Sequence, residues 1–415
     1  MDLFISILAL MFQVLWKSFT SSTFALLFLL LFAIVLWQYK RVEEQSEALP
    51  HGGQRLYLES AVFSTLLGIA GGVVGSALLI LLGIDLSRLG IIYLWVIAML
   101  LMLINARFLC FAYAGGILSL VSLFTGYPAV DVAQVMGLVA VLHLIESFLI
   151  VLNGHFNPIP VYVKKNGSLV GGFNLQKFWP IPLVALIGGG ITLDPGIALV
   201  MPDWWPLIKD YSHLVTGQSY TLLPVLAILG YGEITTTTAP RQRVRTSAGH
   251  LFLFSLVLLL LSIFSSRYPA FLPLAALFGP LGHELVIWLG MREESNRSPL
   301  YTSRGQGVMV LDVKPGTPAQ QAGLLSGDTI LSINRWPVFT HRDLEAGLNQ
   351  GWGDLEIELI RDEKPARVVL KRHFLRDHGL TPVPAGGTRN YIQLREDLFF
   401  NLARKAWHRL KRIGA

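Results

Sequence analysis

Four titratable side chains lie within strongly apolar stretches of this sequence: His143, Glu146, His283 and Glu284. A charged or titratable group in a hydrocarbon environment costs free energy, so such groups are candidates for a function. His143 and Glu146 are three residues apart and would lie on one face of a helix, as a metal pair or a proton relay would. The alternative, which we favour, is an interhelical hydrogen bond that fixes helix packing.

A His-Glu pair such as His283-Glu284 also occurs in the zinc motif of site-2 intramembrane metalloproteases. That motif needs a second histidine four residues after the first, so that both imidazoles bind one ion. Ile287 stands at that position here. We therefore assign no metal ligand, no catalytic residue and no cofactor from the sequence. For His283 and Glu284 we favour a structural role, in which the acid pairs with an arginine in or beside the membrane.

The composition defines the class of protein. Of 415 residues, 53% are hydrophobic and 14% are charged, whereas soluble domains have about 25% charged residues. Several segments reach the roughly 20 apolar residues that a bilayer requires. The sequence therefore predicts a polytopic α-helical membrane bundle within residues 1–292, with about eight spans and a range of about six to nine. Because Asp2 stands where a signal peptide has basic residues, we expect no cleavable signal.

The predicted spans are apolar segments between polar loops. They lie at residues 24–37, 58–82, 90–105, 108–124, 132–152, 180–191, 222–231, 251–265 and 272–288, with 222–231 as part of a longer or re-entrant segment. Residues 3–16 are predicted as a helix at the interface. Within 155–178, two β-rich runs flank the turn Lys165-Asn166-Gly167, which predicts a small extramembrane hairpin. The one cysteine, Cys110, lies in an apolar run and cannot form an internal disulfide.

Lysine and arginine are unequally distributed over the predicted loops. One side of the membrane receives Lys40, Arg41, Arg55, Arg107, Lys164, Lys165, Lys177, Arg241, Arg243, Arg245 and Arg292, and the other receives Arg88, Lys209 and Arg267. Because cytoplasmic loops collect lysine and arginine, this predicts that the C-terminal region is cytoplasmic. The net charge of +6 indicates orientation toward anionic lipid, and without an aromatic-interleaved basic groove we expect no nucleic-acid binding.

The C-terminal region has a second pattern, that of a small α+β domain at 300–374. Its signals are a strand at 308–313, a break at Pro315-Gly316 and Pro318, a turn at Gly327-Asp328, a strand at 329–333, a helix at 341–348 and a hairpin at 355–360 and 366–370. This order resembles bacterial PDZ domains, which are partly open β-barrels with helices that capture peptide ends.

The PDZ resemblance implies that a peptide binds by adding a strand, with its carboxylate on backbone N–H groups. The residues implied are Arg304, Gly305, Gln306 and Gly307 as the carboxylate cradle, Val308, Met309 and Val310 as the pairing strand, and His341, Leu344 and Leu348 as the pocket wall. As an alternative, Leu344 or Leu348 fills the domain core. Residues 375–415 are predicted as a linker and, from Tyr391, a basic amphipathic helix that binds anionic lipid or an acidic partner, or packs on the domain.

A polytopic membrane region followed by one PDZ-like domain, without a convincing catalytic set, resembles the MinJ-like division-site determinants of Gram-positive rod-shaped bacteria. The resemblance implies a non-enzymatic scaffold in the bacterial cell membrane, enriched at the septum and poles. There it would link a DivIVA-type polar scaffold to the MinCD division inhibitor, with DivIVA-type and MinD-type proteins as partners. Two alternatives stay open: a site-2 type metalloprotease or protease regulator with metal at His283, and a small-solute or proton transporter that uses His143 and Glu146.

Overall fold

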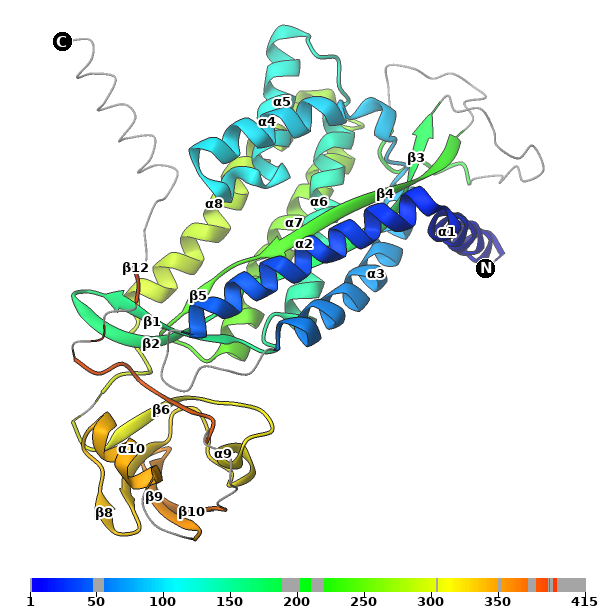
Figure 1. Ribbon diagram of the computed structural model, residues 1–415. Helices are drawn as coiled ribbons and strands as arrows, with labels where there is room; N and C mark the ends of the chain where they lie inside the picture. The colour runs from blue at the N-terminus through cyan, green and yellow to red at the C-terminus, as the bar shows by residue number, and fades with distance from the viewer. Residues whose placement is uncertain are drawn as a thin grey trace, which may run out of the picture.

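The computed structural model describes residues 2–47, 56–188, 202–209, 220–303, 305–349, 353–371, 378–386, 388 and 391–393. It is a helical bundle with a smaller β-rich domain at one end, which we call the domain end (Figure 1). Among the described residues, five helices are long and apolar enough to cross a membrane. They are α2 (Ser22–Glu47), α3 (Tyr57–Leu82), α6 (Val132–Asn153), α7 (Pro240–Ser265) and α8 (Leu272–Asn296).

Three further apolar helices in the described part of the chain are shorter: α1 (Asp2–Thr20), α4 (Ile91–Ile104) and α5 (Phe111–Thr125). The predicted number of about eight spans is therefore not confirmed. α4 and α5 have 14 and 15 residues, which is about 21–23 Å of helix against a hydrocarbon core of about 30 Å. Their outer ends lie together, because the hydroxyl oxygens of Tyr93 and Tyr127 are 2.9 Å apart.

The helices α4 and α5 thus form one hairpin, and its tip lies inside the bundle. The tip consists of the 3₁₀ turn η2 (Ala106–Leu109) and Cys110, and it contacts side chains near the centres of α6 and α8. The sequence predicts separate spans at 90–105 and 108–124. In the structure they are the two arms of one hairpin, which we call the re-entrant hairpin because it enters and leaves the bundle at the same end.

A long β-hairpin runs along the bundle where the sequence predicts membrane helices. β3 (Lys177–Gly188) and β4 (Tyr220–Tyr231) pair antiparallel over all 12 residues of each strand, and the hairpin follows the direction of α2 (Figure 1). The predicted spans at 180–191 and 222–231 are wrong for the described residues of these segments. A short apolar run suits a buried strand as well as a helix, so the apolar pattern of these segments does not decide between the two.

The edge of β3 that faces away from β4 is hydrogen-bonded to side chains and not to a further strand. Three of its N–H groups donate to side chains: Phe178 to Tyr39 Oη (3.1 Å), Val184 to Ser76 Oγ (2.7 Å) and Gly188 to Asp85 Oδ1 (2.9 Å). At two positions between them, Pro180 and Pro182 have no N–H. There α3 approaches through glycines: a Cβ on Gly68 would lie 2.3 Å from the Pro180 oxygen, and one on Gly72 would lie 2.1 Å from the Pro182 oxygen. The peptide groups on this edge of β3 therefore face protein and not lipid, which is the condition for a strand within a membrane bundle.

A small sheet closes the domain end of the bundle. β1 (Ile159–Lys165) and β2 (Ser168–Asn174) form an antiparallel hairpin, and β5 (Ile234–Thr235) and β12 (Ile392–Gln393) extend it in the order β12-β1-β2-β5. The sequence predicts a helix from Tyr391, but Ile392 and Gln393 are a strand that pairs parallel with β1. Residues 394–415, which carry the rest of the predicted basic helix, lie outside the described residues.

The small domain follows α8 and has its own core. Its elements are β6 (Val308–Val313), α9 (Pro318–Gln321), β7 (Thr329–Ile333), β8 (Trp336–Pro337), α10 (His341–Asn349), β9 (Leu355–Arg361), β10 (Lys364–Leu370) and β11 (Leu380–Pro382). The sheet order is β10-β9-β7-β6-β11, with β8 beside β7. Val308 and Val310 face the core of this domain. Met309 and Leu311, on the opposite face of β6, join the apolar cluster of the bundle.

Candidate peptide groove and intramembrane polar cluster

The helix α10 forms one side of the predicted peptide groove, and a reciprocal cap fixes its start. The Asp343 N–H donates to Thr340 Oγ1 (3.2 Å), and the Thr340 N–H donates to Asp343 Oδ2 (2.8 Å). This places Leu344 and Leu348 inward, where both are buried in the domain core. His341, the third member of the predicted pocket wall, is only half-buried.

The edge of β6 that faces this groove pairs with a strand of the same chain. We call residues 378–383 the strap; its central part is β11, which pairs antiparallel with β6. The Lys314 N–H donates to the Gly379 oxygen (2.9 Å), and the Val383 N–H donates to the Met309 oxygen (2.9 Å). In this structure the edge of the predicted pairing strand is occupied by the strap.

The strap lies between β6 and α10. His341 on α10 is hydrogen-bonded to the backbone of Val383; burial lowers the pKa of its imidazole, and this hydrogen bond and the nearby Glu345 oppose the shift. On the β6 side, burial raises the pKa of Asp312, which is paired with Thr381, to about 6. Both groups are therefore partly shielded from water along the strap.

The loop predicted as the carboxylate cradle precedes β6. Gly305 and Gly307 have φ values of +77° and +80°, which suit glycine. A Cβ on Gly307 would also lie 2.4 Å from the Ile330 oxygen. Gln306 lies between the two glycines, and Arg304 lies outside the described residues.

Three of the four intramembrane candidates contact residues of the α4–α5 hairpin. His143 on α6 and His283 on α8 both point toward Cys110: their Nε2 atoms lie 3.0 and 3.7 Å from its sulfur. Glu284 forms an ion pair with Arg107 and accepts a hydrogen bond of 2.7 Å from the Tyr113 hydroxyl. Glu146 does not belong to the group of converging ligand atoms that Cys110, His143 and His283 form among the described residues.

Sequence reasoning missed Arg107, Cys110 and Tyr113 as members of this cluster. All three come from the re-entrant hairpin, which the sequence predicts as two separate spans. One signal was present: Arg107 interrupts an apolar stretch that would otherwise run from residue 90 to 124. A charged residue at this position can lie in a loop outside the membrane, as the sequence predicts, or at the buried tip of a hairpin.

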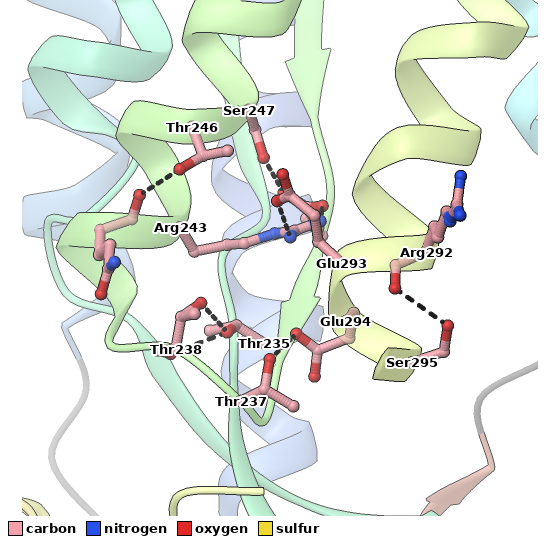
Figure 2. Close-up of polar contacts among 12 residues, drawn as sticks. Thr235, Thr237, Thr238, Arg243, Thr246, Ser247, Arg292, Glu293, Glu294 and Ser295 are labelled. Atoms are coloured by element: carbon pink, nitrogen blue, oxygen red, sulfur yellow. Dashed lines mark hydrogen bonds and ion pairs between the residues drawn. The ribbon is translucent and has the colours of Figure 1, made fainter. Parts of the chain in front are cut away.

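A second polar network lies at the domain end, where α7 and α8 meet the β5 loop (Figure 2). The Glu294 carboxylate accepts hydrogen bonds from the Thr236 N–H (2.8 Å), the Thr236 hydroxyl (2.5 Å) and the Thr237 hydroxyl (2.8 Å). Arg243 of α7 forms ion pairs with Glu233 and with Glu293 of α8. Since the Leu300 N–H also donates to the Thr236 oxygen (2.9 Å), this network fixes the connection that leads into the small domain.

The fold and the groove define the class: a protein with several apolar helices of membrane-spanning length and a C-terminal PDZ domain. A family profile described as PDZ domain matches residues 288–371, from the last turns of α8 to β10. Among curated proteins, the chain is similar to the cell division topological determinant MinJ of Bacillus subtilis, with 27% identity over 236 residues. That match covers 56% of this chain and 55% of MinJ.

Other relatives share a shorter region with this chain. The putative serine protease HhoA of Synechocystis is 29% identical over 99 residues, or 22% of this chain and 24% of HhoA. A probable periplasmic serine endoprotease, DegP-like, of Rhizobium meliloti is 31% identical over 107 residues, or 24% of this chain and 21% of that protein. The chain thus spans about half the length of MinJ and less of the proteases, whose similarity supports the PDZ domain only.

Proposed function

We propose that this protein is a membrane-anchored adaptor that recruits protein partners through the groove between β6 and α10. The observation that supports the proposal is the antiparallel pairing of β11 with β6, because a partner peptide would pair with the same edge of β6 in the same way. Backbone hydrogen bonds supply affinity in this binding mode, and side-chain pockets supply specificity. No catalytic residue is needed for it.

Under this proposal a partner peptide competes with the strap. The strap fills the β6 edge through the Val383 N–H and the Gly379 oxygen, so a peptide that adds to the same edge has to displace it. An internal strand is held at a high effective concentration, which lowers the apparent affinity of any peptide. The groove is therefore regulated by whatever holds or releases the strap.

The similarity to MinJ supports a place for this adaptor in cell division. We propose that it lies at the septum and poles and links a DivIVA-type polar scaffold to the MinCD inhibitor through DivIVA-type and MinD-type partners. The basic tail would add contact with anionic lipids. The MinJ-like resemblance implies these partners.

A cytoplasmic position of the PDZ domain is supported by the charge distribution over the described residues. The domain end carries Lys40, Arg41, Lys164, Lys165, Lys177, Arg241, Arg243, Arg245 and Arg292, and the far end carries Lys17, Arg88, Lys209 and Arg267. Arg107, which the sequence analysis places in a loop on the cytoplasmic side, instead pairs with Glu284 inside the bundle. When Arg107 is left out of the count, lysine and arginine still lie mostly at the domain end, as expected for a cytoplasmic face.

The location of a fluorescent fusion in dividing cells tests the proposal. We expect the full-length protein to be enriched at midcell and poles, and deletion of residues 300–415 to leave the membrane region in place but abolish partner recruitment. Deletion of residues 394–415 alone is the matched control, because it keeps the whole groove. Uniform membrane staining of the full-length fusion, or unchanged partner localisation after the larger deletion, would contradict an adaptor role.

A further inference from the structure

Three side chains from three separate elements bring their metal-binding atoms together inside the bundle. They are Cys110 at the hairpin tip, His143 near the centre of α6 and His283 near the centre of α8. The Cys110 Sγ and a ring nitrogen of each histidine all lie within 4.8 Å of one another. The Sγ to Nε2 distances are 3.0 Å for His143 and 3.7 Å for His283.

Hydrogen bonds on the far side of each imidazole determine which nitrogen carries the proton. The His143 Nδ1 lies 2.7 Å from the Val139 oxygen; a carbonyl oxygen only accepts, so Nδ1 is protonated and Nε2 is a free acceptor. The His283 Nδ1 lies 3.4 Å from the Tyr113 hydroxyl. That hydroxyl donates its own proton to Glu284, so it accepts from Nδ1–H and leaves the His283 Nε2 without a proton.

The three side chains together lack one hydrogen-bond donor. Two imidazole Nε2 atoms point at Cys110 as acceptors, and a thiol has a single S–H to donate. One Nε2 therefore faces sulfur without a proton between them. His143 is buried and the other two residues are partly buried, so an unsatisfied polar group there costs free energy. A metal cation would satisfy all three atoms at once.

We propose that Cys110, His143 and His283 bind a zinc ion. A thiolate with two imidazoles is a ligand set for zinc and similar soft or borderline cations, whereas magnesium and calcium take oxygen ligands. With Zn–S of about 2.3 Å and Zn–N of about 2.0–2.1 Å, a tetrahedral site places sulfur about 3.5–3.6 Å from nitrogen and the two nitrogens about 3.3–3.4 Å apart. The two sulfur–nitrogen distances, 3.0 and 3.7 Å, lie on either side of this value. The ion therefore fits after the thiol moves by about half an ångström and the two imidazoles, whose ligand atoms lie within 4.8 Å of each other, close around it by up to about 1.5 Å.

Two features of the surroundings match those of metal sites. The Val139 oxygen and the Tyr113–Glu284 pair hold the imidazoles by Nδ1, as outer-shell groups do for metal-bound histidines. Cys110 is the N-cap of α5, and its sulfur accepts from the Ala112 N–H at 3.4 Å; a helix N-terminus favours the thiolate that metal binding requires. Binding releases the thiol proton to solvent. The ion would then join the re-entrant hairpin to α6 and α8.

The experiment uses the full-length protein in detergent, stripped with a chelator and reloaded with zinc or cobalt(II). We expect about one zinc ion per chain, and with cobalt a thiolate-to-metal charge-transfer band in the near ultraviolet. Cys110→Ser should remove that band, and His143→Asn or His283→Asn should weaken metal binding by about tenfold or more. His250→Asn, on α7 outside the cluster, is the control and should bind as the unmodified protein does.

Loss of metal binding can be distinguished from loss of folding. Gel filtration identifies variants that fail to fold, and Cys110→Ser, which changes one atom, keeps the test valid if the histidine variants aggregate. Binding of far less than one ion per chain by the unmodified protein, or a cobalt spectrum that Cys110→Ser leaves unchanged, overturns the proposal. Since this site lies outside the PDZ domain, either result is independent of the adaptor function proposed above.

Discussion

At the scale of single residues, the intramembrane charges are explained by their partners. Glu284 is 3% exposed and Arg107 is 19% exposed in the ion pair that they form. The sequence analysis favours an arginine partner for Glu284 but places Arg107 in a loop. A carboxylate at mid-bundle needs this partner, because an unpaired buried charge costs much more than a buried pair.

Arg107→Gln should therefore strongly destabilise the bundle. We expect a loss of about 3–5 kcal/mol, because it leaves the Glu284 carboxylate buried without its counter-charge. The double variant with Glu284→Gln should recover most of this loss, since it removes both charges. Unfolding in a denaturing detergent measures the effect; equal losses in the single and double variants would show that the charge pairing is not responsible.

Asp312 has a shifted pKa and lies outside the membrane-spanning segments. Burial raises the pKa of Asp312 from 3.8 to about 6, so the folded domain favours the protonated acid. Its contribution to stability is fully present below pH 4 and is lost as the pH rises through about 6.

Asp312→Asn should remove this pH dependence. At neutral pH we expect the variant PDZ domain to be more stable by up to about 3 kcal/mol, the free energy that corresponds to a shift of about two pKa units. Below pH 4 the two proteins should unfold alike. Thermal unfolding of a fragment spanning residues 298–393 at several pH values measures this, with Glu363→Gln, in the exposed turn between β9 and β10, as the control. A constant difference at all pH values would argue against burial of an ionised Asp312.

At the scale of elements, the hairpin β3–β4 depends on close approach of α3. The glycines of α3 at 68 and 72 allow carbonyl groups of β3 to lie where a side chain would otherwise be. The sequence contains these small residues at helical spacing, a pattern typical of helix packing in lipid. In this protein the glycines of α3 pack against the strand β3. A row of small residues on a helix therefore does not by itself identify whether a helix or a strand packs against it.

Gly72→Ala should destabilise this contact. A Cβ there would lie 2.1 Å from the Pro182 oxygen, a backbone atom, so the strand has to move. We expect a cost of about 1–3 kcal/mol, as for overpacking of a core. Gly249→Ala in α7, where a Cβ meets nothing within 4 Å, is the control and should be neutral or slightly stabilising. The fluorescence of the buried Trp179 reports unfolding of both, and similar stability of the two variants would contradict this packing.

At the scale of the whole molecule, the strap connects the PDZ domain to the bundle. Tyr162 of the β1–β2 hairpin donates a hydrogen bond of 2.8 Å to the Pro382 oxygen, and the next residue, Val383, donates to β6. β12 then pairs with β1 beyond the strap. Occupancy of the groove and docking of the domain on the membrane region are therefore coupled through one short segment.

Val383→Pro should release the strap and open the groove. Proline removes the N–H that donates to the Met309 oxygen. We expect partner peptides to bind the full-length variant more tightly, by about threefold to tenfold for a lost hydrogen bond of about 1 kcal/mol. Ala385→Pro, just past the strap, is the control because no hydrogen bond of the Ala385 N–H is described. Peptide titration measures the affinities; unchanged binding in Val383→Pro would mean that the strap does not compete.

The sequence alone determined the features that depend on local pattern. The order of strand, Pro-Gly break, Gly-Asp turn and helix identified the PDZ domain, because turn residues and strand periodicity act over a few neighbouring residues. Composition identified the membrane class for the same reason. Apolar content by itself could not distinguish the strands β3 and β4 from membrane helices, since both bury similar residues.

Only the tertiary structure decided what the polar residues do. Cys110, His143 and His283 lie on three elements far apart in sequence, and no local spacing predicts that their ligand atoms meet. They converge because the arms α4 and α5 have only 14 and 15 residues, so that the hairpin tip lies beside the centres of α6 and α8. In the same way, the strap reaches β6 only because the domain is folded. Contacts of this kind depend on chain topology, which a reading of neighbouring residues does not contain.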